Sequence, residues 1–179
     1  ADQGHAQAAF YLGFVDALAY YNQVSNMIDV NILPPVFSLK SFPGSDPLVH
    51  IAVDVKGKNI KHRNLILSVV FYYDNGDNLQ GPLAAEYNTP IDCNLNGMLG
   101  STSNLYSTVN DNTFNNIFMF PSQSLWPYPE YRGSILILAH MEICEIANNG
   151  EPIPHTSADY RFTLECRSGF LGFPKFKIL

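Results

Sequence analysis

The residues best suited to acid–base or metal chemistry lie on either side of one predicted turn. His140 and Glu142 share a face of a predicted strand, and His155 or Asp159 could join them across the turn that follows. Imidazole and carboxylate groups in such a cluster can transfer protons or bind a metal ion. Polar side chains on a solvated strand face explain the same pattern. We favour this second interpretation, because the histidines form neither an H-x-H nor an H-E-x-x-H motif.

A second group of oxygen ligands lies in the segment 74–78, which holds Asp74, Asp77 and two asparagines. Calcium takes such carboxylate and amide oxygens, but the spacing differs from that of an EF-hand loop. The Asn75-Gly76 pair is typical of a hairpin turn, so we predict a turn without metal. Motifs for a serine nucleophile, a phosphate-binding loop or a dinucleotide-binding loop are absent. We therefore expect no enzyme, no cofactor and no metal.

An aromatic cluster follows in the segment 126–131, where Trp126, Tyr128 and Tyr131 alternate with Pro127 and Pro129. Rigid aromatic rings bury a large area at a small entropic cost, which suits binding of a sugar ring or a partner chain. The competing interpretation is an internal plug that covers one end of the fold.

The elements that must position these residues are β-strands. The segment 133–167 predicts two strands joined by a turn rich in Gly, Pro and Asn. The first strand is apolar on both faces over 135–138, which predicts a central beginning and an end nearer a sheet edge. In the second strand, polar residues alternate with a predicted core face made of Ala158, Tyr160, Phe162, Leu164 and Cys166.

Two further alternating segments, 48–56 and 63–74, are expected to pair as a hairpin through a turn at 57–59. The segment 27–39 looks extended, and Pro34-Pro35 predicts an edge strand or a corner. Together these patterns predict a mainly antiparallel β-sandwich, immunoglobulin-like or jelly-roll, over residues 27–179. Residues 1–26 would form an N-terminal apolar arm, either helical or extended.

Both ends of the chain are rich in apolar residues, although charge is sparse elsewhere. An apolar arm that its own sheet does not bury can pack against a neighbouring copy. We expect an assembly interface formed by Phe10, Leu12, Phe14, Val15, Leu18 and Tyr21 near the start and by Phe170, Phe173, Phe176 and Leu179 near the end.

The composition excludes several classes of partner. Charged residues make up 15% of the chain, and ten Lys and Arg residues leave a net charge of −6. Such a chain has too little positive charge to neutralise the phosphates of nucleic acids. No run of about 18 apolar residues predicts a membrane span. The chain begins at Ala1, which we interpret as a processed mature terminus and hence as an extracellular or cell-surface location.

Three cysteines, Cys93, Cys144 and Cys166, allow one disulfide and leave an odd thiol. Cys144 and Cys166 do not face each other in the expected hairpin, so a bridge would join Cys93 to one of them. Three buried reduced thiols are the alternative.

The sequence therefore predicts a secreted structural subunit that assembles with copies of itself into a filament, surface layer or shell. The alternative hypothesis is a non-catalytic module that binds carbohydrate or another surface protein through the aromatic segment 126–131.

Overall fold

The computed structural model describes residues 27–43, 45–86, 89–127, 130–169 and 173–179. This part of the chain contains eleven strands and two short 3-10 helices. In chain order they are β1 (Asp29–Ile32), β2 (Val36–Lys40), β3 (Leu48–Lys58), β4 (Leu65–Asp74), β5 (Leu79–Gln80), η1 (Ile91–Cys93), β6 (Asn94–Leu95), β7 (Met98–Leu105), β8 (Asn112–Pro121), η2 (Ser122–Leu125), β9 (Gly133–Ile146), β10 (Pro152–Ser168) and β11 (Pro174–Ile178).

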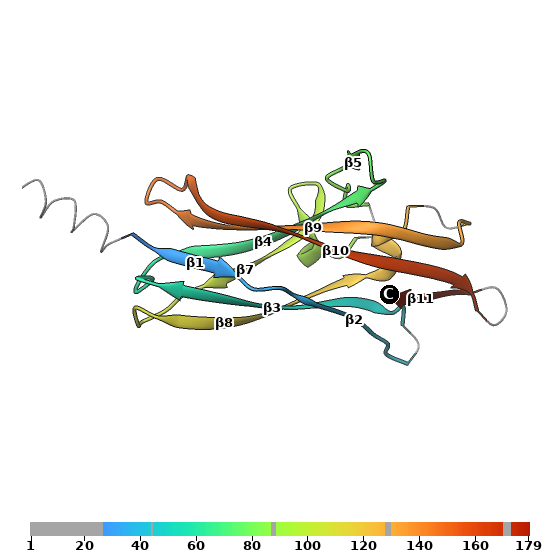
Figure 1. Ribbon diagram of the computed structural model, residues 1–179, viewed down its shortest axis with the longest axis horizontal. Coiled ribbons are helices and arrows are strands. Elements are labelled where there is room, and N and C mark those ends of the chain that lie inside the picture. The colour runs from blue at the N-terminus through green and yellow to red at the C-terminus, as the bar shows by residue number, and fades with distance from the viewer. Residues whose placement is uncertain (1–26, 44, 87–88, 128–129, 170–172) are drawn as a thin grey trace, which may run out of the picture.

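Two antiparallel sheets form the two layers of the molecule (Figure 1). In the smaller sheet β3 is central, with β8 along one edge and β1 followed by β2 along the other. The larger sheet has the strand order β11-β10-β9-β4-β7-β6, and β5 pairs with the end of β4. This arrangement confirms the predicted mainly-β antiparallel sandwich. The predicted arm, residues 1–26, lies outside the described residues.

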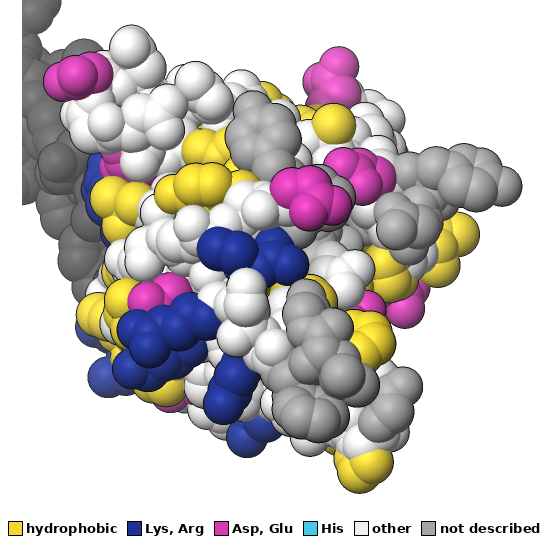
Figure 2. Space-filling view, turned by 90° about the vertical axis from the view of Figure 1, so that its right-hand side faces the viewer, with side chains coloured by type: hydrophobic (Ala, Val, Ile, Leu, Met, Phe, Trp, Pro, Cys, Tyr) yellow, Lys and Arg dark blue, Asp and Glu magenta, His cyan; other side chains and the backbone are white. Residues whose placement is uncertain are grey.

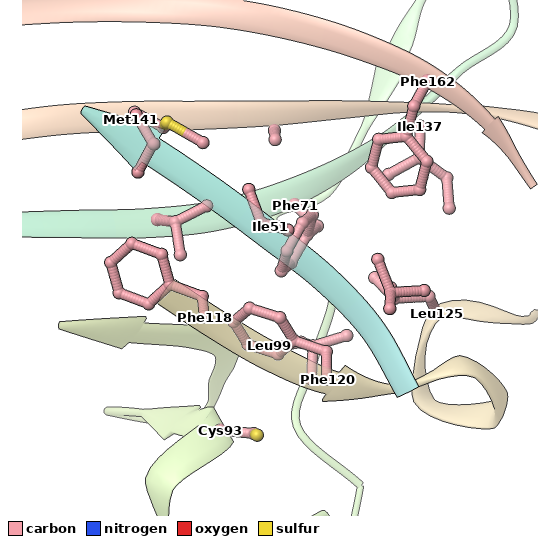
Figure 3. Packing of buried hydrophobic residues seen from close by; sticks show 14 of the residues in the cluster. Ile51, Phe71, Cys93, Leu99, Phe118, Phe120, Leu125, Ile137, Met141 and Phe162 are labelled. Atoms are coloured by element: carbon pink, nitrogen blue, oxygen red, sulfur yellow. The ribbon is translucent and has the colours of Figure 1, made fainter. Parts of the chain in front are cut away.

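The hydrophobic core lies between the two sheets, and Figure 3 shows its side chains meeting from both layers. Phe71 of β4 and Phe120 of β8 come from different sheets, and their rings meet edge to face at 4.7 Å between centroids. Such aromatic pairs add roughly 0.5–1.5 kcal/mol beyond the area they bury. Alternate residues of β3 contribute four aliphatic side chains to the same core, Val49, Ile51, Val53 and Val55.

The predicted hairpin of the segment 133–167 is confirmed as β9 and β10, and the core face of β10 follows the predicted alternation. The predicted order along β9 is wrong. Strand β4 pairs with Ile137 to Glu145, so the polar end of β9 is central and its beginning extends past β4. The central position tolerates Glu145 because its carboxylate accepts hydrogen bonds from Arg63 at 3.0 Å and lies 3.3 Å from His155.

The predicted pairing of the segments 48–56 and 63–74 is also wrong, because β3 and β4 belong to different sheets. The connection crosses from one layer to the other, and Ile60 is buried within it. Gly57 leaves room for this crossing, since a Cβ atom there would lie 2.7 Å from Ile60 Cδ1. Asn59 and His62 turn the chain with φ angles of 56° and 58°.

The segment 27–39 forms an edge, as predicted. Strands β1 and β2 lie one after the other along β3, and Leu33, Pro34 and Pro35 separate them. Proline has no backbone N–H to donate to a ladder, so this edge is interrupted. Within the described part of the chain, no helix is both long and apolar enough to cross a membrane.

Candidate functional site

The aromatic corner, Trp126 to Tyr131, lies at one end of the sandwich, directly after η2. Trp126 is only 7% exposed, and its indole N–H donates to the Tyr131 carbonyl at 3.1 Å. Its ring stacks on Tyr131 and meets Phe176 edge to face. Trp126 is therefore a plug, whereas Tyr131, 42% exposed, still offers ring surface to a ligand. Tyr128 lies outside the described residues.

Two depressions flank this corner. One has a volume of about 470 Å³ and lies between Tyr131, the start of β9 and the turn after β4. The other, of about 500 Å³, lies on the side of Trp126 and Phe176 and has Asp46 and Glu86 in its lining. Both volumes fall within the range of small-molecule sites. Figure 2 shows the end of the molecule that carries the corner, with Lys and Arg side chains gathered near its centre.

Asp74 closes the first depression at the end of β4. Its carboxylate accepts a hydrogen bond from Arg161 Nε at 2.6 Å and another from the Gly76 N–H at 2.8 Å. The hydrogen bond from Arg161, followed by that from Gly76, lowers the pKa of Asp74, so the group is ionised at neutral pH. Asp74 and the following residues form a turn closed by this Gly76 contact, with Gly76 at φ 83°.

The predicted polar cluster on β9 and β10 is partly assembled. His140 Nδ1 lies 2.7 Å from Asp159 Oδ1, and the two residues face each other in register. His155 lies instead beside Glu145, on the other face of β9. Neither depression at the aromatic corner includes His140. Among the described residues no three His, Cys, Asp or Glu side chains are placed to hold a metal ion.

Two of the sheet edges are blunted in ways that oppose pairing with another chain. The edge strand β11 carries Lys175 and Lys177. The edge formed by β1 and β2 is broken at Pro34 and Pro35. Lysine, short strands and proline are the usual protections of an exposed edge. At the opposite edge of the larger sheet, β6 pairs only with Met98 and Leu99, so the rest of β7 is an uncharged edge without a further strand partner among the described residues.

The remaining edge belongs to β8 and lacks these protections, and near its end the Met119 carbonyl accepts a hydrogen bond from the Cys93 thiol. Its ten residues, NTFNNIFMFP, include no charge, and proline appears only as the last residue. Its outer side has no strand partner among the described residues. Ile117 and Met119 point away from the core and are 61% and 50% exposed. They continue an apolar row across the outer face of the smaller sheet, because Ile117 pairs with Ala52, and Ala52 pairs with exposed Val36.

The predicted assembly residues near the C-terminus separate into two groups. Phe176 is buried in the core of its own chain, where it contacts Trp126. Phe173 and Leu179 are exposed and remain available to a partner. Outside the described residues lie Phe170 and the six arm residues, Phe10, Leu12, Phe14, Val15, Leu18 and Tyr21.

The predicted disulfide is absent, and Cys93, Cys144 and Cys166 are free thiols. Cys166 pairs with Gly133 at one end of β9, and Cys144 lies near the other end of that strand. At about 3.3 Å per residue, the two cysteines are some 36 Å apart along the strand. Cys93 lies beside β8, where its Sγ contacts the Met119 carbonyl. A disulfide needs Cα atoms within about 7 Å.

Comparisons with known proteins assign no family to this chain. No family model matches it, and no curated protein matches its sequence. Four solved chains match it. One is an X-ray structure of Northeast Structural Genomics Consortium target SoR45, which is 10% identical over 77% of this chain and 87% of that chain, with a TM-score of 0.29. A structural similarity with so low a TM-score supports no conclusion about function.

The aromatic corner was predicted from the sequence, but the open edge of β8 and the depression beside Asp74 were not. A signal for the edge was available, because the segment 112–121 carries no charge and ends in the apolar run 117–120. No pattern in the sequence indicated the depression. Asp74 and Tyr131 are far apart in the sequence, and only the pairing of β9 with β4 brings their strands together.

Proposed function

We propose that this protein is an extracellular or cell-surface structural subunit that assembles with copies of itself, and that the edge of β8 receives an apolar segment from a neighbouring copy. The observation that carries the proposal is the edge of β8, whose ten residues carry no charge and have no strand partner on their outer side among the described residues. A long uncharged edge offers unpaired backbone groups to an added strand. Exposed Ile117 and Met119 add apolar area to the same contact.

The proposed occupant is the apolar segment 10–21 of another copy. Phe10, Leu12 and Phe14 alternate with Tyr11 and Gly13, a pattern that can add one apolar face to a sheet. Backbone hydrogen bonds to β8 would provide affinity, and the alternate aromatic side chains would lie over the row that contains Ile117. A helix from the same segment would contact the row with its side chains and leave the backbone of β8 unpaired.

The position of Met27 lets this segment reach β8. The Met27 carbonyl accepts a hydrogen bond from Asn59, just beyond the end of β3. Strand β8 begins at that same end, where Asn112 pairs with Gly57. Two strand spacings, about 10 Å, separate β1 from β8 across β3. A 26-residue segment spans at most about 90 Å when extended, so it can reach either its own β8 or that of a neighbour.

The test replaces Ile117 with Lys and, separately, removes residues 1–23. Multi-angle light scattering and negative-stain microscopy of native material measure the particle size. We expect the full chain to form large particles and both variants to remain monomers, with a mass of about 20 kDa for Ile117→Lys and a smaller mass for the chain that lacks residues 1–23. A lysine in the row would have to be desolvated beside apolar rings, which opposes contact.

Ile153→Lys is the matched control, because Ile153 is an exposed isoleucine on β10, away from β8. This variant should assemble like the unmodified chain. A deletion variant that still polymerises would show that the segment 1–23 is not the occupant. A monomeric full chain at every concentration would contradict self-assembly itself.

A further inference from the structure

We propose that the depression beside Tyr131 is a binding site for a neutral pyranose sugar. Its lining combines an exposed aromatic ring with a carboxylate, two amides and a hydroxyl, from Tyr131, Asp74, Asn75, Gln80 and Ser134. Its volume of about 470 Å³ suits a small ligand. This site is independent of the β8 edge, so it goes beyond the proposed role in assembly.

The aromatic wall is held in place before any ligand arrives. One face of Tyr131 stacks on Trp126, with 5.5 Å between ring centroids and 24° between ring planes. Gly133 lies directly beside the phenol, since a Cβ atom there would be 2.6 Å from Tyr131 Oη. These contacts fix the ring, so binding costs little conformational entropy. The apolar C–H face of a pyranose can pack on the exposed part of this ring.

The polar side of the depression contains both satisfied and unsatisfied groups. The side chain of Asp74 is 9% exposed and held by Arg161, and a carboxylate that accepts two hydrogen bonds has lone pairs left for ligand hydroxyl groups. The side chains of Asn75, Gln80 and Ser134 have no hydrogen bond to another described residue. Amides donate and accept, which matches the paired donor and acceptor character of sugar hydroxyls.

The charges around the depression select a neutral ligand. Among the described residues no Lys or Arg side chain lines it, so a phosphate, sulfate or uronic acid group would be repelled by the Asp74 carboxylate and would find the Arg161 guanidinium already paired with it. A cationic ligand gains little from Asp74, because Arg161 already forms an ion pair with that carboxylate at 2.6 Å. A polyhydroxylated neutral ring is the chemistry that uses the aromatic surface, the amides and the remaining lone pairs together.

The experiment titrates the whole chain with the methyl glycosides of glucose, galactose, mannose and N-acetylglucosamine, with glucuronic acid as the acidic comparison. Trp126 is the only tryptophan and touches Tyr131, so its fluorescence should report binding, and saturation-transfer NMR provides a second readout. We expect at least one neutral glycoside to bind with a Kd on the order of 1 mM. Loss of one neutral hydrogen bond should weaken that binding up to about tenfold in Asn75→Ala and in Gln80→Ala.

Asn104→Ala is the control, because Asn104 is an exposed asparagine on β7, outside this depression. Its affinity should equal that of the unmodified chain. Both depression variants change exposed side chains, so circular dichroism should show an unchanged fold. The proposal is overturned if no neutral glycoside binds at about 20 mM, where a 1 mM site would be nearly saturated. It is equally overturned if glucuronic acid binds more tightly or if both depression variants bind like the control. The chain lacking residues 1–23 should bind equally well, so a failure of assembly and a failure of sugar binding are distinguishable.

Discussion

Replacing Trp126 with Ala tests whether the indole closes the end of the sandwich. The side chain is 7% exposed, and truncation removes its contacts with Tyr131 and Phe176. Large-to-small substitutions of buried Trp cost about 3–5 kcal/mol. The hydrogen bond to the Tyr131 carbonyl is lost as well, but Arg132 still donates to that carbonyl at 2.9 Å. No buried acceptor is left unpaired, so we expect a loss near 3 kcal/mol, at the lower end of that range.

The free energy of unfolding is measured by urea titration with circular dichroism, which does not depend on the indole that the substitution removes. A loss of about 3 kcal/mol should lower the Tm by roughly 6–12 °C for a chain of this size. Trp126→Phe keeps an aromatic ring and loses the N–H donor, so its cost should be smaller, about 1–1.5 kcal/mol.

Phe42→Ala is the control, because Phe42 is an exposed aromatic residue near the same end of the sandwich. Its effect should stay within about 0.5 kcal/mol. The reasoning is refuted if Trp126→Ala also costs less than about 1 kcal/mol, because the indole would then contribute no more than a surface side chain.

Three further predictions concern ionisable groups. The pKa of Asp74 is below its ordinary value of 3.8. The ionised carboxylate therefore stabilises the fold above pH 3.8, and this stabilisation is lost as the pH falls through the folded-state pKa. The stability of Asp74→Asn should depend less on pH between these two values than that of the unmodified chain. Mass spectrometry without reductant should find three free thiols, whereas a bridged pair would contradict the fold. Burial raises the pKa of all three thiols, so accessibility decides the order of reaction. Native-state alkylation should modify half-buried Cys144 first, and prior labelling of either buried thiol would contradict this order.

Alternation along the chain was sufficient to predict the sandwich and much of its core. Phe162, Leu164 and Cys166 lie on the predicted inner face of β10 because the pleat places every second side chain on the same side. Alternation identifies a face and does not identify a partner strand. The pairing of β3 with β4 was therefore mispredicted, although both have the expected core face.

The remaining wrong predictions concern residues whose position or burial depends on contacts with residues far away in the sequence. Glu145 made the end of β9 look peripheral, but Arg63 and His155 let that end occupy a central position. The aromatic segment by itself left both a platform and a plug open. Strand β11 decided the question for Trp126, since Phe176 packs on the indole from the far end of the chain.

The unprotected edge of β8 has a consequence for how particles would grow. A subunit with one acceptor edge and one donor segment joins its neighbours head to tail. A chain of such subunits is directional, with an empty acceptor at one end and an unused donor at the other. Growth then stops only by ring closure or by a capping molecule. A free peptide that copies the segment 10–21 would occupy the empty acceptor and act as that cap.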